Sequence, residues 1–327
     1  MTSTNASPSA FGWDFQVNAA IVLMLDHIKE AKCIRVEGSV EDVEITLQDS
    51  SKIYGQAKSY SKLGDDPNAI AKLTKALTTL DNAAAKGDGS MFLFMTNSPN
   101  PFLDESSRSY FYGLSRYSLA ELPQSAYDKV RDIISKNGFK NLETDQLEIY
   151  FIPFNGLNLR TRYKAIRERI NGFLEDTVND VPLITNRLME IWQSDFFHNA
   201  SMPDAKITIT KEQFIWPLIV LVIESIAAVD YMKEFNDDEI EELKTKYNLI
   251  INKEISDYEL ITRVISDFYL SKKDRKSFVN EDWSDYLDIV DGISADLDTK
   301  EALVKVILFR ILMQKQRINA IKKGVGL

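Results

Sequence analysis

Side chains able to bind a metal ion and a phosphate gather in one short polar stretch, residues 37–58. Asp42 and Glu44 are separated by one apolar residue, and so are Gln56 and Lys58. Because successive side chains of a strand point to opposite faces, each pair would lie on one face of its strand. Two such pairs on neighbouring strands can converge on a single site.

These groups are suited to phosphodiester hydrolysis, which uses a hard divalent cation such as Mg²⁺ or Mn²⁺ with oxygen ligands. Asp42 is the expected carboxylate ligand, and the Gln56 side-chain carbonyl and the Ala57 backbone oxygen could complete the protein's share of the shell. Glu44 is a further acidic ligand on the face of Asp42. Lys58 would orient or deprotonate the attacking water and stabilise the transition state. Since solvated strands often show the same alternation, the prediction depends on the surrounding elements.

Those elements are indicated by apolar periodicity and by turn residues. Asp14 is the expected N-cap of the first helix. Helices are expected at 15–32 and 69–85, and strands at 33–37, 42–47, 52–57 and 91–96, the last of them fully apolar. A helix near 125–136 and a strand near 146–153 extend the same domain. The predicted order is helix, strand, strand, strand, helix, strand, which places the polar pairs in a central sheet.

From residue 159 onward nearly every segment has helical periodicity. Helix-start signals recur at 210–213, 236–239 and 256–259, each ahead of an apolar run. The chain is therefore expected to divide into a flexible N-terminus (1–10), an α/β domain (11–157) and a helical interaction or oligomerisation domain (158–327).

Composition limits the classes of function. The formal charge of −10 argues against general adhesion to nucleic acid, which depends on lysine and arginine neutralising phosphates. Cys33 is the only cysteine, so an internal disulfide and a cysteine-rich zinc site are excluded. Without a signal peptide or an apolar run long enough to cross a bilayer, the chain is expected to be cytoplasmic and free of the membrane.

Two basic clusters stand out in the second half. Arg160, Arg162, Lys164 and Arg167 form the first, and on one helix Arg160, Lys164 and Arg167 would share a face that could track a phosphate backbone. A solvated helix surface is the alternative, and the favoured one. The second cluster, residues 272–276, either follows a helix C-terminus, where cations are favoured, or contributes to DNA binding.

At this point the chain resembles a known family. The element order, with an acidic residue opening the second strand and Gln-x-Lys on the third, resembles the common core of the PD-(D/E)XK nuclease superfamily. The local segments are similar to the double-stranded DNA endonuclease domain of bacterial anti-phage effectors, found in cyclic-oligonucleotide (CBASS) systems and as the nuclease subunit of Lamassu-type systems with an SMC-like ATPase. Related domains pair with HerA-type ATPases. The segments are Gly12 to Gln16, Val36 to Gly38, Glu41 to Ile45, Gln56 to Lys58 and Thr96-Asn97.

The resemblance covers about residues 11–97 and implies a restriction-endonuclease-like core. It implies that Asp42, Gln56 and Lys58 are catalytic, that Glu37 joins them, and that Gln16 on the first helix supports the site. Gln56 stands where many members of the superfamily have glutamate, which leaves fewer negative charges on the metal. Glu37 or Glu44 would compensate.

The sequence therefore predicts a metal-dependent endonuclease acting on double-stranded DNA, an effector subunit of an anti-phage system. Its acidic charge and helical half suggest a silent resting state, activated by release from an ATPase partner or by homo-oligomerisation. One alternative is a non-catalytic subunit whose sheet only binds DNA or protein. Another is a ribonuclease or single-strand nuclease with the same metal chemistry.

Overall fold

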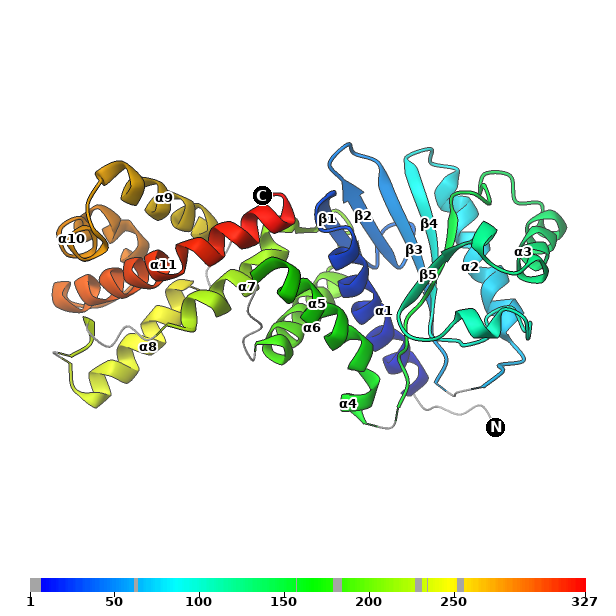
Figure 1. Ribbon diagram of the computed structural model, residues 1–327, viewed down its shortest axis with the longest axis horizontal. Coiled ribbons are helices and arrows are strands. Elements are labelled where there is room, and N and C mark those ends of the chain that lie inside the picture. The colour runs from blue at the N-terminus through cyan, green and yellow to red at the C-terminus, as the bar shows by residue number, and fades with distance from the viewer. Residues whose placement is uncertain are drawn as a thin grey trace. The chain divides into compact units, whose positions relative to one another are not determined.

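A mixed seven-stranded sheet forms the centre of the first of two units in the computed structural model (Figure 1). Unit 1 is Met1–Lys211 and unit 2 is Glu212–Leu327. The structure describes residues 7–61, 64–156, 158–178, 184–226, 231–233, 235–251 and 256–327.

The strand order in the sheet is β5-β6-β4-β3-β2-β1-β7. The strands are β1 (Ala31–Val36), β2 (Val43–Leu47), β3 (Lys52–Lys58), β4 (Gly89–Thr96), β5 (Ser115–Ser118), β6 (Leu147–Phe151) and β7 (Ile209–Thr210). β1, β2 and β3 form an antiparallel meander, while β3, β4 and β6 run parallel. β4 is buried between two neighbours, which explains its continuous apolar sequence.

Helices cover both faces of this sheet. They are α1 (Ser7–Asp26), α2 (Ala69–Ala84), α3 (Gln124–Asn137), α4 (Leu159–Arg162), α5 (Lys164–Val178) and α6 (Thr185–Ser201), with 3-10 turns η1 (Arg108–Tyr110) and η2 (Leu119–Glu121). α2 packs on the face that carries Tyr54 and Phe94, where Leu77 lies in the same buried cluster. α1 packs on the opposite face, where the Tyr150 hydroxyl donates a hydrogen bond to the Asp26 carboxylate. The predicted order of six elements is confirmed, and the third strand is held between two layers.

The start of the first helix differs from the prediction. α1 begins at Ser7, so Asp14 lies inside the helix and is not its N-cap. The Asp14 carboxylate instead accepts hydrogen bonds from the Tyr163 hydroxyl at 2.9 Å and from Arg162 at 3.1 Å. Asp14 precedes an apolar run, as an N-cap often does, and the local sequence does not reveal its distant partners Arg162 and Tyr163.

Unit 1 also extends past the predicted boundary at 157/158. α5 and α6 pack against α1, and β7 pairs with β1. The Arg169 guanidinium binds the Asp26 carboxylate at 2.7 Å, and Trp192 and Phe196 on α6 are fully buried. The helical periodicity expected there is confirmed at 159–162, 164–178 and 185–201, and these helices belong to unit 1.

The secondary-structure elements in the described residues of unit 2 are all helices. Its elements are α7 (Lys211–Glu224), which starts at the junction, α8 (Asp237–Ile251), α9 (Ser256–Ser271), α10 (Arg275–Glu281), the 3-10 segment η4 (Trp283–Val290) and α11 (Leu297–Val325). α11 packs against α8, α9, α10 and η4. The start signal at 236–239 is confirmed, since Asn236 and Glu239 bond each other's backbone amides. In the described part of the chain, no helix combines the length and apolarity needed to cross a membrane.

A buried arginine fastens the end of α6 to the sheet. Arg35 on β1 is 3% exposed, and its guanidinium donates to the backbone carbonyls of Asn199 (2.6 Å), Met202 (2.8 Å) and Ile207 (2.9 Å). The Asn199 side chain accepts from the backbone amide of Val36 at 3.0 Å. One planar cation thus donates to three backbone carbonyls at the end of α6 and in the following loop.

Arg35→Met is expected to destabilise unit 1 by at least about 3 kcal/mol, because three backbone carbonyls lose the charged donor that the guanidinium supplies. Arg35→Lys should restore part of this loss, since an ammonium cannot reach all the carbonyls together. Urea unfolding followed by circular dichroism measures both. Arg131→Met, at an exposed arginine on α3, is the control. Equal midpoints for the Arg35 and Arg131 variants would contradict this role.

Candidate functional site

The polar pairs on β2 and β3 meet as the alternation predicts. Val43 pairs with Gly55 in the antiparallel ladder, so Asp42, just before β2, stands opposite Gln56. Asp42 Oδ2 accepts hydrogen bonds from the Ala57 amide at 2.9 Å and from the Gln56 side-chain nitrogen, and lies 3.5 Å from Lys58 Nζ.

The Asp42 and Lys58 side chains are each 22% exposed, so a substrate can reach them. Lys58 Nζ also donates to the Ala57 carbonyl at 3.1 Å. The ammonium is therefore fixed over the end of β3, between a carboxylate and a backbone oxygen. Electrostatically the site is a carboxylate and a cation held together at the solvent-exposed end of a buried strand.

Gln56 is oriented differently from the prediction. Its amide nitrogen faces Asp42, and its carbonyl oxygen accepts from the Thr79 hydroxyl of α2 at 2.6 Å. The oxygen expected to bind metal thus points away from Asp42. Rotating the amide by half a turn exchanges the two atoms and offers Thr79 a donor in place of an acceptor, which a hydroxyl accommodates.

One oxygen of Glu44 is engaged in another contact, and the assignment of Glu44 as a metal ligand stays a prediction. Its Oε1 accepts from the backbone amides of Val40 (2.8 Å) and Glu41 (3.3 Å). A Cβ at Gly38 would lie only 2.1 Å from the same oxygen, so a side chain there would displace the Glu44 carboxylate. Glu44 holds the 38–41 turn that leads into Asp42, and acts on the site through that turn.

Gln16 and Glu37 form a support on the α1 side. Gln16 Nε2 donates to Glu37 Oε1 at 2.9 Å and to the Asp42 backbone carbonyl at 3.0 Å. Glu37 has a positive φ of 53°, a strained conformation for a residue with a side chain. One glutamine thereby fixes both the Glu37 carboxylate and the backbone that carries Asp42.

The sequence analysis missed Glu41. Its side chain is 3% exposed, and within the described structure neither carboxylate oxygen has a hydrogen-bond partner. The neighbouring Thr79 has a single hydroxyl hydrogen, which is directed at Gln56 or at the Ala76 carbonyl. Burial, and next the negative charge of Asp42, raise the pKa of Glu41 to about 8, while Lys58 lowers it. The adjacent acids at 41 and 42 were visible in the sequence, but the burial of Glu41 was not.

An unpartnered buried carboxylate needs either a proton or a cation. The donors near it suit a hard divalent cation: the Glu41 and Asp42 carboxylates and, after amide rotation, the Gln56 oxygen. Among the described residues, however, no group of three or more acidic, histidine or cysteine side chains is arranged to hold a metal ion. The two carboxylates and the amide therefore fit a cation with a large share of water ligands.

The predicted basic surface is altered by two structural features. Arg162 forms an ion pair with Asp14 at 3.1 Å and lies 5.1 Å over the Phe11 ring, so it fastens α4 to α1. Arg162 thus has a structural role in unit 1.

The remaining members of that cluster do not share one continuous helical face. The helix is interrupted at Tyr163, the C-cap of α4, and α5 starts at the next residue. Arg167 donates to the Arg160 carbonyl across this break, and Lys164 lies 3.7 Å from Glu168 on the surface. A shared face for Arg160, Lys164 and Arg167 requires one uninterrupted helix, whereas these residues lie on two helices, α4 and α5.

Comparisons with known proteins add little. No family model matches the chain, and no curated protein matches it. A solved structure, the Moraxella osloensis Cap4 SAVED/CARF-domain containing receptor, is similar with a TM-score of 0.38 and 16% identity over 64% of this chain. The match spans 47% of that receptor, about half its length. A similarity this weak establishes neither a family nor a function.

Glu41→Gln is expected to flatten the pH dependence of stability in EDTA. The folded protein holds the Glu41 proton up to about pH 8, whereas the unfolded chain releases it near 4.5, so stability falls as pH rises through this window. The loss is at most about 1.4 kcal/mol per pH unit. The variant should match wild type near pH 4.5 and exceed it increasingly towards pH 8.

Urea midpoints at pH 5, 6.5 and 8 measure this difference. Glu105→Gln is the matched control, since Glu105 is 83% exposed. Parallel curves for wild type and Glu41→Gln would show that Glu41 is ionised and stabilised in the fold by some other means.

Proposed function

We propose that this chain is a metal-dependent endonuclease that hydrolyses phosphodiester bonds of double-stranded DNA, with Asp42, Gln56 and Lys58 as its catalytic residues. The convergence of Asp42 and Lys58, 3.5 Å apart at the exposed end of β3, carries this proposal. The observed order α1-β1-β2-β3-α2-β4 supports a restriction-endonuclease-like core, because it sets an acid before β2 and Gln-x-Lys on β3.

Glu41 and Asp42 would hold a Mg²⁺ or Mn²⁺ ion, with the rotated Gln56 amide as a third ligand. Such an ion, when bound, polarises the phosphate and lowers the pKa of water. The buried Glu41 oxygens without a partner are the observation that fits it. Glu37 contributes through Gln16, which ties it to the Asp42 backbone, and Glu44 through the turn.

Lys58 would stabilise the reacting phosphate. An ammonium group has three protons, and two are directed at Asp42 Oδ2 and the Ala57 carbonyl. The third is available for the attacking water or for a non-bridging phosphate oxygen. Water attacks phosphorus, the bond to the leaving oxygen breaks, and the positive charge of Lys58 offsets the negative charge that develops.

The biological setting belongs to the same proposal. The sequence resemblance to anti-phage effectors supports a defence role. The charge of −10, together with the structural use of Arg162, supports a resting state with low DNA affinity. Activation by an SMC-like or HerA-type ATPase partner, or by self-assembly, would add a basic surface for DNA.

A non-catalytic DNA- or protein-binding subunit is the second candidate. Two observations favour it: the absence, in the described residues, of a preformed cluster of three acidic, histidine or cysteine ligands, and the presence of Gln56 where an acid would hold metal more tightly. In that case the Asp42–Lys58 pair is a structural ion pair at the C-terminal end of β3. Substitution at Lys58 separates the two candidates.

Lys58→Ala is expected to lower plasmid cleavage by at least about 100-fold, the loss typical of a group that stabilises the transition state. The assay uses the chain with Mg²⁺ or Mn²⁺, assembled with its activating partner, and EDTA should abolish the wild-type activity. Lys52→Ala, at the other end of β3, is the matched control and should retain activity. Cleavage that is equal in the two variants, or that survives EDTA, would exclude this mechanism.

Manganese binding tests Glu41 apart from activity. Glu41→Gln and Asp42→Asn are each expected to weaken Mn²⁺ binding by at least about tenfold, since even residues that only orient a metal ligand have effects of that size. Isothermal titration calorimetry measures the affinity, and Glu105→Gln is the control. Unchanged binding in Glu41→Gln together with loss in Asp42→Asn would remove Glu41 from the metal site while leaving the nuclease proposal standing.

A further inference from the structure

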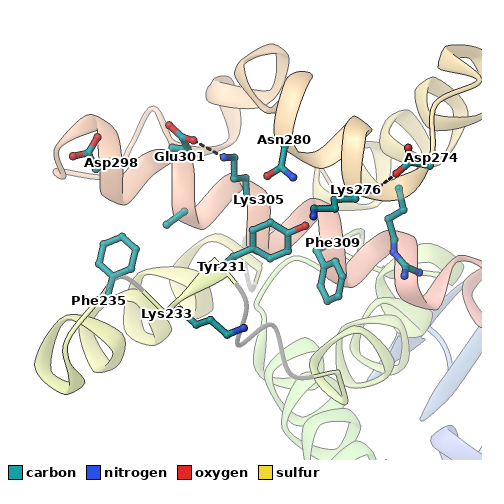
Figure 2. A pocket seen from close by; sticks show the side chains of 12 residues that line it. Tyr231, Lys233, Phe235, Asp274, Lys276, Asn280, Asp298, Glu301, Lys305 and Phe309 are labelled. Atoms are coloured by element: carbon teal, nitrogen blue, oxygen red, sulfur yellow. Dashed lines mark hydrogen bonds and ion pairs between the residues drawn. The ribbon is translucent and has the colours of Figure 1, made fainter.

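A polar cleft of about 1,050 Å³ opens within unit 2, and it is separate from the site on β2 and β3 (Figure 2). Residues of α10 form one wall and residues of α11 another, and Tyr231, Lys233 and Phe235 also line the cleft. The α11 wall is one helical face, because its lining residues fall at 298, 301, 302, 305 and 309. Its volume is that of a site for a sizeable organic ligand.

Aromatic rings occupy part of this cleft. The Tyr231 and Phe309 rings lie with centroids 5.3 Å apart, and Phe235 lines the same space. The Arg275 guanidinium lies 5.5 Å from the Phe309 ring centroid. Figure 2 shows Lys276 on α10 and Tyr231 pointing towards each other. A flat, π-bonded group entering the cleft would therefore meet rings and a planar cation together.

Four cations, Lys233, Arg275, Lys276 and Lys305, and three acids, Asp274, Asp298 and Glu301, line the cleft, so its lining carries one more positive charge than negative. The Asp274 carboxylate accepts from the amides of Lys276 and Ser277 and from the Ser277 hydroxyl, and Glu301 pairs with Lys305. In the described part of the chain, neither Arg275 nor Lys276 takes part in an ion pair, and both are exposed.

The other members of the same basic cluster are placed differently. Lys273 binds Glu281 at 3.2 Å and Asp282 at 2.6 Å, away from the cleft. Lys272 is exposed and does not line the cleft. Of the four cations that the sequence places at 272–276, the structure thus directs two, Arg275 and Lys276, towards one ligand-sized space.

We propose that this cleft binds a nucleoside phosphate. Arg275 and Lys276 would hold the phosphates, because guanidinium and ammonium groups form strong charge-assisted hydrogen bonds with them. The base would stack on the Tyr231 and Phe309 rings. Asn280, whose amide both donates and accepts, lines the α10 wall within the same space and can read the edge of the base.

This combination distinguishes a nucleotide from an acidic protein segment. A peptide rich in glutamate would use Arg275 and Lys276 but has no flat ring for the aromatic wall. A purely apolar ligand would meet uncompensated cations. Only a ligand with an anionic end and a π-bonded end uses both halves of the cleft.

The test is a fluorescence titration of the full chain with N-methylanthraniloyl-ATP, performed in EDTA to exclude binding through a metal at Asp42. Saturable binding that unlabelled ATP displaces is expected. Arg275→Gln and Lys276→Gln should each weaken it by about tenfold, and Tyr231→Ala by about tenfold through lost stacking. Lys272→Gln removes an equal charge from the same cluster outside the cleft, and should leave the affinity unchanged.

Competition identifies what is recognised. Tripolyphosphate and adenosine should each displace the probe much less well than ATP. Displacement by tripolyphosphate as effective as by ATP would overturn the proposal, because the aromatic wall would then contribute nothing. Equal loss in Lys272→Gln and Lys276→Gln would overturn it too, and so would binding of a polyglutamate peptide but of no nucleotide. Unchanged circular dichroism of each variant shows that an observed loss is not unfolding.

Discussion

The antiparallel register between β2 and β3 is the constraint on which the candidate site depends. Val43 opposite Gly55 brings Asp42 against Gln56, Ala57 and Lys58. A shift of one residue would turn Gln56 and Lys58 to the α1 face and leave Asp42 without its partners. Two contacts place β3 against β4, and a third fixes the turn before β2.

These contacts restrict the position of β3 and of the turn that leads into β2. Tyr54 on β3 is buried and stacks on Phe92 of the next strand, with centroids 6.0 Å apart. A Cβ at Gly55 would lie 2.7 Å from the Met95 terminal carbon, so a side chain there would displace the Met95 side chain that packs against β3. Glu44 fixes the turn before Asp42. The site is thus held by tightly packed apolar groups beneath it and by hydrogen bonds at its edge, while strain remains at Glu37 and an unsatisfied acid at Glu41. Such local costs are typical of positions kept for binding and not for stability.

The sequence predicted what local periodicity controls. The order of the first six elements, the meander and the buried β4 all follow from spacing within ten or twenty residues. The extent of unit 1 could not be predicted in this way, because the contacts that bind α6 to β1, such as Arg35 with Asn199, join residues far apart in the chain. The cap assigned to Asp14 was wrong for the same reason, since the carboxylate binds Arg162 and Tyr163. The burial that singles out Glu41 is likewise a property of the packed sheet and not of its neighbours in sequence.

Three arginines near α1 in unit 1 have partners within the fold. Of the arginines near the α1 layer, Arg35 is buried on carbonyls, Arg162 binds Asp14, and Arg169 binds Asp26. Each helps to hold the fold. Among the described residues, Lys58 is the cation that forms an ion pair with Asp42. A divalent cation on Glu41 and Asp42, or a basic surface on another molecule, would add positive charge where DNA approaches. The arrangement agrees with the proposed nuclease, whose affinity for DNA would depend on what is bound to it.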